Sequence, residues 1–180
     1  MRIVDTALAE VRILEPDVHR DERGFFLESF RADWPLQAGG LVTFVQDNHS
    51  RSIRDTLRGL HWQWRRPQAK LIRVVAGAIF DVVVDVRRGS PSFGRWVGAD
   101  LSAESFRQLF VPVGFAHGFC VLTDTADIEY KCSDYYDPAG EAGLAWDDPA
   151  VAVVWPVRTP LLSKRDQSHP PLTQDRPDLL

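Results

Sequence analysis

The stretch Leu71–Arg87, which reads LIRVVAGAIFDVVVDVR, decides the fold class of this chain. It is dense in Val and Ile, the β-branched residues that favour strands. In its second half the side chains alternate between the two faces of a strand. One face carries Phe80, Val82, Val84 and Val86, and the other carries Asp81, Val83 and Asp85. Because Ala76-Gly77 separates two such runs, we predict two strands joined by a tight hairpin.

Short runs of the same kind follow one another along the rest of the chain, bounded by Gly, Pro, Asp or Asn. They are Val11–Leu14, Phe25–Phe30, Leu41–Gln46, Arg107–Val111, Gly118–Leu122, Asp127–Cys132 and Val151–Trp155. Helical signal is limited to one or two turns at Arg31–Gln37 and a short turn at Ser102–Ser105. The Pro-rich tail after Pro156 predicts irregular structure on the surface. The chain is therefore predicted to be all-β, a jelly-roll-like barrel or sandwich with short peripheral helices and an irregular C-terminal tail.

Length and composition indicate one domain spanning residues 1–180, because 180 residues with 44% hydrophobic and 26% charged side chains match an ordinary globular domain. The two cysteines, Cys120 and Cys132, form no CxxC motif and point to a reducing compartment. A net charge of −4 argues against binding to nucleic acid. The chain has neither an apolar run long enough for a membrane span nor the apolar stretch of a signal peptide. We expect a cytoplasmic protein.

Two residues between the predicted strands are candidates for a pocket. His61 follows Arg58-Gly59-Leu60 in a strand-like segment, where a histidine is more often structural than functional. Lys70 precedes a run that looks buried, and a lysine there is more often a rim residue with its ammonium in solvent. Because both lie near the starts of adjacent strands, together they indicate the mouth of a barrel, where pockets tend to form.

The segment Pro112–His117 has the Pro-x-Gly-x-x-His spacing, which resembles the second motif of the cupin barrels. In metal-binding cupins the first motif supplies His-x-His and a Glu seven residues before a Gly. The matching positions here are His61, Gln63 and Lys70, the last of them seven residues before Gly77. A lysine ammonium has three donors and no lone pair, so it repels a metal ion. We therefore expect a metal-free pocket with a fixed positive charge, which suits an anionic intermediate.

Further motifs occur in order over most of the chain. They are Asp21–Phe26 with Glu28, Phe44–Ser50, Arg58–His61, Gln68–Lys70, Pro112–Phe119, Tyr130-Lys131 with Tyr135-Tyr136, Trp146, Asp148-Pro149, Trp155-Pro156 and Leu162–Asp166. With these motifs the chain closely resembles, from about Asp21 to Leu172, the dTDP-4-dehydrorhamnose 3,5-epimerase family of the cupin superfamily. The resemblance implies a cupin-like jelly roll and a cofactor-independent isomerase. It would take a dTDP-linked 4-keto-6-deoxy sugar and invert C3 and C5, the two carbons beside the ketone.

The resemblance assigns four catalytic positions. His61 would be the base, and Asp166 would orient its imidazole, which is a competent base at neutral pH. Lys70 would face the enolate oxygen, and Tyr130 would return a proton from the opposite face. Without the resemblance, Asp166 would be interpreted as a solvated charge of the tail and Tyr130 as a packing residue. Because Asp166 is far from His61 in sequence, only a tail folded over the barrel mouth can bring them together.

The same resemblance assigns the binding positions. Arg23 and Arg58 match positions that contact phosphate and nucleotide, where a guanidinium can bind two oxygens at once. The other positions implied to contact the nucleotide or the sugar are Glu28, Gln46, Asp47, Asn48, His117, Glu141, Arg165 and His19. Two of them depart from the family pattern, since relatives commonly have Lys at position 165 and an aromatic residue at position 19. Members of the family are homodimers, often with an exchanged N-terminal strand, so a homodimer is implied.

Three alternatives remain open from the sequence. The chain could be a 3-only or 5-only epimerase, because such members share nearly the same catalytic residues. It could be a metal-dependent cupin enzyme that uses His61, His117 and His49, although Lys70 weighs against this. It could also be a binding module for nucleotide sugars without activity. Such a module would need the two arginines but not Asp166, so the retained acid–base motifs argue against it.

Overall fold

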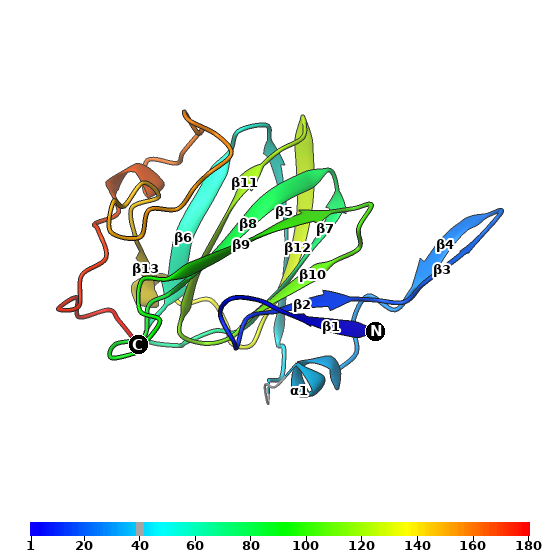
Figure 1. The fold of residues 1–180 in the computed structure, drawn as a ribbon, viewed down its shortest axis with the longest axis horizontal. Helices are drawn as coiled ribbons and strands as arrows, with labels where there is room; N and C mark the ends of the chain where they lie inside the picture. The colour runs from blue at the N-terminus through cyan, green and yellow to red at the C-terminus, as the bar shows by residue number, and fades with distance from the viewer. Residues whose placement is uncertain (39–41) are drawn as a thin grey trace.

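The structure is a computed structural model that describes residues 1–38 and 42–180, and two antiparallel sheets face each other in it (Figure 1). Within these ranges, six strands form the larger sheet in the order β1 (Arg2–Asp5), β2 (Arg12–Glu15), β10 (Gln108–Val111), β7 (Lys70–Ala76), β12 (Thr125–Cys132), β5 (Gln46–Ile53). Five strands of the described chain form the smaller sheet in the order β13 (Glu141–Gly143), β6 (Leu57–Gln63), β11 (Phe115–Val121), β8 (Ala78–Asp85), β9 (Trp96–Ser102). The predicted all-β sandwich is confirmed.

The main core lies between the two sheets, and β8 shows how the sequence builds it. Ile79 and Val83 point into this core with no exposed surface, beside residues of the larger sheet such as Ile72. Val82 and Val84 point to the opposite face and enter a second apolar cluster. The alternation predicted for this stretch is therefore confirmed. Each such side chain stabilises the fold by about 1.5–3 kcal/mol relative to an exposed position.

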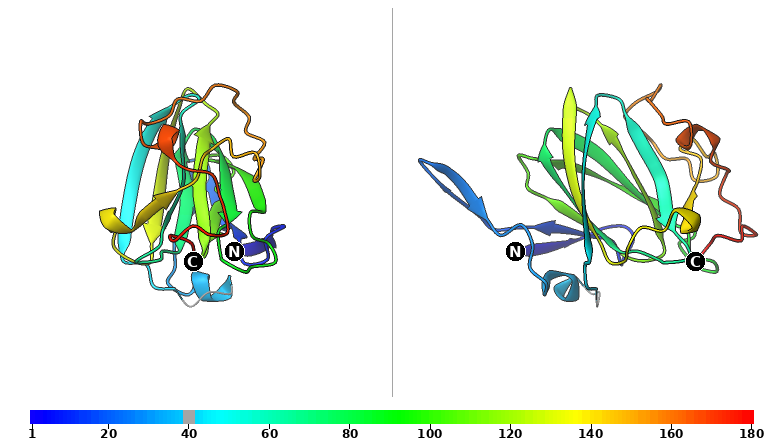
Figure 2. Two further views of the ribbon diagram at one scale, coloured as in Figure 1. Left: turned by 90° about the vertical axis from the view of Figure 1, so that its left-hand side faces the viewer. Right: turned by 180° about the vertical axis from the view of Figure 1, so that it is seen from behind.

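The C-terminal tail covers the outer face of the smaller sheet (Figure 2). Leu144, Val151 and Leu172 pack there against the second face of β8. Arg176 is buried and donates a hydrogen bond of 2.9 Å to the carbonyl oxygen of Gly143. The tail is irregular, as predicted, apart from an isolated bridge at Leu161 and the short 3-10 helix η2 (Asp166–Ser168). It thereby brings η2 against β6.

The predicted hairpin at Ala76-Gly77 is wrong. β7 pairs with β10 and β12, whereas β8 pairs with β11 and β9, so the chain changes sheets at this point. Gly77 forms the corner with φ +73°, and a Cβ there would lie 2.2 Å from the carbonyl oxygen of Thr125. Each run finds its hydrogen-bonding partners in later strands of its own sheet and not in the other run.

Most of the other predicted elements are present, with two exceptions. The first is Leu41–Gln46, of which residue 41 lies outside the described residues, while 42–45 form no strand and β5 begins at Gln46. The second is Val151–Trp155, which forms a loop. The carboxylate of Asp148 accepts backbone hydrogen bonds from the residues that follow it and turns the chain there. The predicted helix at Arg31–Gln37 is the short α1 (Trp34–Gln37), and a second 3-10 turn, η1, spans Pro138–Gly140.

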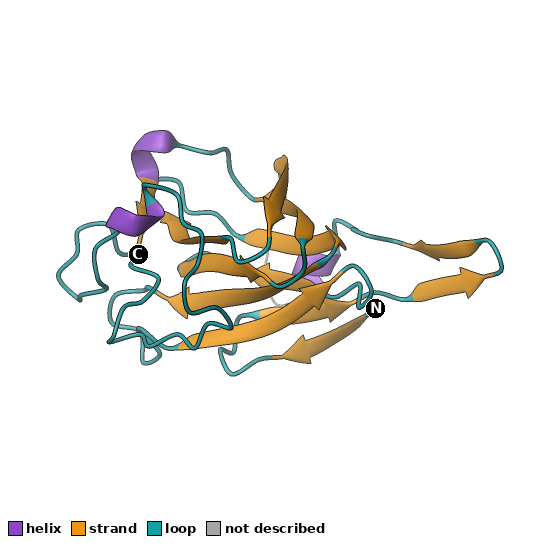
Figure 3. Cartoon of the chain, turned by 90° about the horizontal axis from the view of Figure 1, so that it is seen from above, coloured by secondary structure: helices purple, strands orange, loops and turns teal. Residues whose placement is uncertain are grey.

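One hairpin projects away from the sandwich (Figure 3). It consists of β3 (Val18–Asp21) and β4 (Gly24–Leu27), which pair only with each other among the described residues. Phe25 and Phe26 on β4 are 58% and 67% exposed, although Phe25 contacts the ring of Phe106. No helix in the described part of the chain has the length and apolar character needed to cross a membrane.

Candidate active site

A cavity of about 750 Å³ lies beside β6, with walls from both sheets and from the C-terminal tail. Most of the predicted site residues line it. They are His61, Asp166, Tyr130, Lys70, Gln46, Asn48, Arg58, His117, Glu141 and Arg165. Because they come from six strands and the tail, only the folded chain brings these residues together.

β5 supplies one wall of the cavity through every second residue. Gln46 and Asn48 point into it, and the Gln46 amide donates a hydrogen bond of 3.0 Å to the Asn48 side-chain oxygen. Asp47 lies on the other side of the strand, where Lys131 donates to its carboxylate over 2.8 Å. The structure therefore does not place Asp47 in the cavity, because neighbouring residues of a strand point to opposite faces.

β6 and β11 come unusually close where they carry their histidines. A Cβ at Gly59 would lie 2.7 Å from the Cα of Gly118, so only glycine permits this approach, and Gly59 has φ +110°. The register places His61 directly opposite His117, with an irregularity in pairing just beyond. The glycine two residues before the predicted base thus permits the close approach of the two strands at the site.

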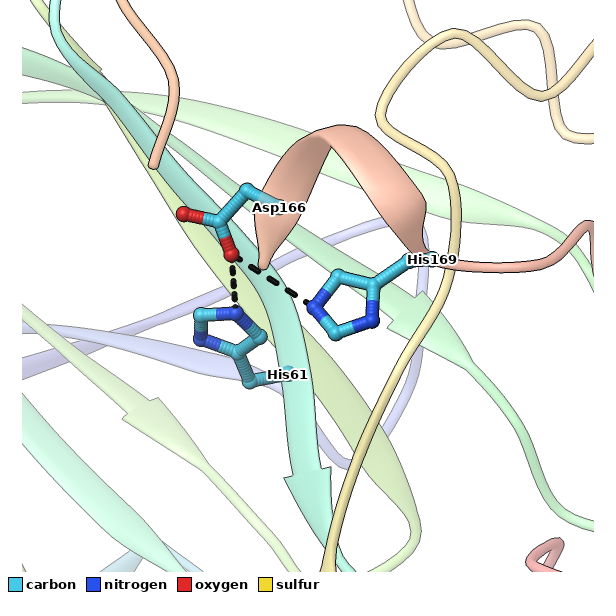
Figure 4. A group of neighbouring side chains, drawn as sticks. All are labelled: His61, Asp166 and His169. Carbon is cyan, nitrogen blue, oxygen red and sulfur yellow. Dashed lines mark hydrogen bonds and ion pairs between the residues drawn. The ribbon is translucent and has the colours of Figure 1, made fainter. Parts of the chain in front are cut away.

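The predicted pair of His61 and Asp166 is present (Figure 4). Nε2 of His61 lies 2.5 Å from Oδ1 of Asp166, and the two side chains are 18% and 3% exposed. Ser163 donates a hydrogen bond of 2.8 Å to Oδ2 of the same carboxylate and accepts one of 3.1 Å from the Asp166 backbone N–H. Since Nε2 is occupied by the carboxylate, Nδ1 of His61 is the nitrogen left for a substrate.

The electrostatics of the pair follow from burial and from its hydrogen bonds. Burial favours the neutral acid, but the nearby imidazoles of His169 and His61 and the Ser163 hydroxyl outweigh it and hold the pKa of Asp166 well below its usual range. Burial is also the largest influence on His61 and lowers its pKa, while Asp166 opposes that effect. His61 is consequently a neutral imidazole at neutral pH, with its proton fixed toward the carboxylate.

The side chains of Lys70 and Tyr130 face the same cavity, and neither makes a hydrogen bond or ion pair with any residue in the ranges 1–38 and 42–180. Burial lowers the pKa of Lys70, partly offset by nearby acidic groups that include Glu141. Burial likewise raises the pKa of Tyr130, so its phenol retains its proton. The cavity thus contains an unpaired amine and an unpaired hydroxyl.

The rim of the cavity carries charged side chains that already have hydrogen-bonding or ion-pair partners. Nε of Arg58 donates to Ser52 over 2.9 Å. Glu141, at the start of β13, accepts a hydrogen bond of 2.7 Å from the Tyr136 hydroxyl and forms an ion pair with Arg165. Arg165 immediately precedes η2, so the ion pair lies beside the Asp166 carboxylate.

Three predicted binding residues lie elsewhere, on or beside the β3–β4 hairpin. Arg23 pairs with Asp21 at the hairpin turn, with 2.5 Å between the guanidinium and the carboxylate. His19 and Glu28 line a separate hollow of about 400 Å³ near α1. Within one chain the structure does not bring these residues to the cavity, because the hairpin extends away from the sandwich.

His169 is a site residue that the sequence analysis missed. Its Nε2 lies 3.5 Å from Oδ1 of Asp166, on the side opposite Ser163. A spacing of three residues places two side chains on one side of a 3-10 turn, so its distance from Asp166 in sequence was the available signal. The spacing of three residues becomes informative only once η2 is known to be helical.

A metal-dependent cupin enzyme would need His61, His117 and His49 to lie close together as ligands. His49 lies on the outer side of β5, 3.3 Å from Asp127, so it does not join His61 and His117. The donors that do come together within the described residues are those of His61, Asp166 and His169, whose ligand atoms all lie within 4.8 Å of one another. Both donors of the close pair already share a short hydrogen bond, and the Lys70 amine faces the same cavity.

Fold and site together define a class of protein: a jelly-roll enzyme whose cavity holds a His–Asp pair, and a lysine and a tyrosine whose side chains have no partner in the described part of the chain. Such a set can remove a proton beside a carbonyl group and return one. The model of the dTDP-4-dehydrorhamnose 3,5-epimerase family matches residues 5–174, and the chain belongs to this family. The resemblance stated from the motifs is confirmed, and the chain is an enzyme of the isomerase type.

Individual relatives agree with the family assignment. A dTDP-4-dehydrorhamnose 3,5-epimerase of Shigella flexneri is 51% identical over 168 residues, which cover 92% of this chain and 93% of the relative. One from Neisseria gonorrhoeae is 55% identical over 167 residues, 92% of this chain, but this match spans only 51% of that protein.

A solved structure agrees as well. The crystal structure of a 3,5-epimerase from Legionella pneumophila, in complex with dTDP-4-keto-L-rhamnose, is 48% identical to this chain. It matches with a TM-score of 0.93 over 95% of this chain and 92% of that one. The fold is therefore that of a family member solved with a nucleotide sugar bound.

Proposed function

We propose that the chain epimerises a dTDP-4-keto-6-deoxyhexose at C3, C5 or both, as in the conversion of dTDP-4-dehydro-6-deoxyglucose to dTDP-4-dehydrorhamnose. The observation that carries this proposal is the 2.5 Å pair of His61 and Asp166 in a cavity shared with Lys70 and Tyr130. Membership of the family supports the substrate class. The liganded Legionella relative supports a dTDP-linked sugar.

In the proposed reaction His61 removes the proton of a carbon beside the C4 ketone. The C–H bond breaks, its electrons form the enolate, and the proton goes to Nδ1 of His61. Asp166 keeps the other ring nitrogen protonated and stabilises the imidazolium that forms. A positioned base of this kind contributes roughly 10²- to 10⁴-fold to the rate.

Lys70 stabilises the enolate oxygen in this scheme. Its amine has no ion-pair partner among the described residues, so its proton is free to bond to the new negative charge. The enolate electrons then form a new C–H bond with the phenolic proton of Tyr130 on the opposite face, which inverts the centre. The Tyr130 phenolate regains a proton from solvent and the His61 imidazolium releases one to solvent, so both groups return to their starting states. Burial holds the pKa of Tyr130 above its usual value, so the donor is protonated when needed.

Arg58 and Arg165 bind the diphosphate in this proposal, while Gln46, Asn48, His117 and Glu141 on the cavity wall contact the nucleotide or the sugar. Both guanidiniums line the cavity, and Arg165 would exchange its ion pair with Glu141 for one with phosphate. Asp47 would act only by holding Lys131 on the other side of β5.

We also propose a homodimer in which the β3–β4 hairpin reaches the cavity of the second copy. Three predicted binding residues, Arg23, Glu28 and His19, lie at this hairpin and away from the cavity of their own chain. The exposed Phe26 on β4 supports a buried contact in the assembly. Arg23→Ala is expected to raise KM for the dTDP-sugar about tenfold with little change in kcat. A monomer by light scattering, with unchanged KM in this variant, would reject the dimer.

The free thiols fit a reducing compartment, and we place the reaction in the cytoplasm. Cys120 and Cys132 are buried and unpaired. Reaction with a thiol reagent after unfolding is expected to titrate both cysteines in protein taken directly from cells.

The proposed function is tested by NMR of dTDP-4-keto-6-deoxyglucose in D₂O with the purified protein. Deuterium at C3 and C5 is expected for a double epimerase, and deuterium at one carbon would identify a 3-only or 5-only enzyme. Tight binding of the nucleotide sugar without any exchange would reject catalysis and support a binding module.

A further inference from the structure

The carboxylate of Asp166 lies close to two imidazoles, although a His–Asp pair requires only one. Oδ1 lies 2.5 Å from Nε2 of His61 and 3.5 Å from Nε2 of His169 (Figure 4). Ser163 occupies Oδ2. The two imidazoles therefore compete for the same oxygen, from β6 on one side and from the end of η2 on the other.

The position of His169 is determined by close packing. Its Nε2 is buried and makes no aligned hydrogen bond within the described ranges, and its approach of 3.5 Å to Oδ1 of Asp166 is a charge–dipole contact. Its ring lies against the backbone of Gly143, where a Cβ would meet ring atoms at 2.4–2.6 Å. Gly143 is in turn the register partner of His61 across β13 and β6. The ring also meets that of His61 edge to face, with centroids 5.2 Å apart and planes at 76°.

Other charged groups reach His61 from the elements around it. Lys70 on β7 disfavours a positive charge on the imidazole, and Glu141 on β13 favours one. Asp166 is the nearest and strongest of the favourable groups. Its influence depends on how much of its negative charge is directed at His61 alone.

We infer that His169 is a positioning residue of this active site, which holds the Asp166 carboxylate between two imidazoles and limits how strongly that carboxylate binds a proton onto His61. The inference rests on the proposed function only in taking His61 as the base. An N–H from His169 withdraws charge from Oδ1 and holds the oxygen in place. Without that donor, the negative charge of Asp166 acts more strongly on His61. The protonated form of His61 is then more stable, and its pKa rises.

The test is a titration of the His61 imidazole by NMR in the substrate-free protein, which needs no catalytic activity. His169→Phe keeps an aromatic ring in the packed site but removes the donor, and we expect it to raise the pKa of His61 by about 0.5–1 unit. His169→Gln retains an N–H at a similar reach and serves as the matched control, with a shift less than half as large. An unchanged or lowered pKa in His169→Phe, or equal shifts in both variants, would overturn the inference.

A second variant keeps the test valid if His169→Phe does not fold. Gly143→Ala leaves the imidazole in the chain but pushes it from its place, and the same upward shift of the His61 pKa is expected. A His61 pKa within 0.2 unit of the parent in a folded Gly143→Ala protein would count against the inference in the same way.

The kinetic readout separates this inference from the proposed function. In His169→Phe the acidic limb of the kcat/KM–pH profile is expected to move to higher pH by the same amount as the His61 titration, and in His169→Gln it is expected to move less. A limb that stays in place in His169→Phe although kcat/KM falls would mean that His169 is merely structural. Absence of exchange in the parent protein would reject the epimerase but leave the NMR test intact.

Discussion

His61 and His117 face each other across β6 and β11, line the same cavity and each lie close to a buried aspartate, yet their surroundings differ. Asp81, from the neighbouring strand β8, approaches Nε2 of His117 to 2.8 Å, but neither of its oxygens makes an aligned hydrogen bond within residues 1–38 and 42–180. Asp166, from the distant tail, has aligned partners on both oxygens.

The difference teaches that closeness alone does not make a catalytic pair. Asp81 is near its histidine because the two strands are adjacent in the sheet, and nothing else in the described residues holds the orientation of its carboxylate. Asp166 is held by several donors, so both its charge and its direction are fixed. A base needs this second condition, because its tautomer must be set before the substrate arrives.

The largest expected effect comes from removing the two imidazoles in turn. His61→Asn is expected to lower the rate of deuterium exchange by about 10³-fold or more, whereas His117→Asn should lower it by only about tenfold. The exchange is followed by NMR in D₂O, with thermal unfolding as the control for folding. Equal losses in the two variants would remove the distinction between the pairs.

The carboxylates are compared next, with a smaller expected loss. In Asp166→Asn an amide N–H faces Nε2 of His61, so the imidazole proton moves to Nδ1 and the base is blocked, at a cost of about 10²- to 10³-fold in kcat. Asp81→Asn is expected to cost less than tenfold. A loss in Asp81→Asn as large as in Asp166→Asn would show that the buried strand pair is also required for chemistry.

The pH dependence of kcat/KM tests the role of His61 as the base. Burial lowers the pKa of His61 below its ordinary value of about 6.5, and only the neutral imidazole can accept a proton. kcat/KM is therefore expected to fall as pH drops through the His61 pKa, with a midpoint below pH 6.5. The profile from pH 4.5 to 8 measures this midpoint, and a midpoint above pH 7 would contradict it.

The free energy of unfolding is expected to depend on pH through Asp166, which lies in the C-terminal tail. The pKa of Asp166 is lower in the folded protein than in the unfolded chain, so its contribution is complete above about pH 4 and is lost as pH falls through the folded pKa. We expect the free energy of unfolding to decline below about pH 4 in the parent, and less steeply in Asp166→Asn. Equal slopes in urea unfolding from pH 5 to pH 2.5 would contradict this.

The smallest expected effect is that of metal removal. The Nε2 of His61 and Oδ1 of Asp166 already share a hydrogen bond, and an amine faces the cavity, so no metal is needed to fix the pair. Dialysis against EDTA is expected to leave kcat within twofold of its starting value. Loss of activity that Zn²⁺, Mn²⁺ or Fe²⁺ restores would support a metal at His61, Asp166 and His169 instead.

The local sequence pattern was sufficient to predict which face of its own strand a residue occupies. The alternation in Leu71–Arg87 predicted both faces of β8. The pattern failed at Ala76-Gly77, because a sharp turn between two apolar runs looks the same whether it joins a hairpin or two sheets. Which strands pair is decided by contacts far apart in sequence.

The candidate site also has features that the sequence predicts and features that only the tertiary structure decides. The sequence by itself determined the all-β class and the family, and it indicated His61, Asp166, Lys70 and Tyr130 as candidate catalytic residues, since motifs are read in chain order. Only the tertiary structure decided that the tail brings Asp166 within 2.5 Å of His61, that His169 shares its carboxylate, and that the hairpin residues leave their own cavity. The physical reason is that hydrogen bonds act over about 3 Å in space, whatever the separation in sequence.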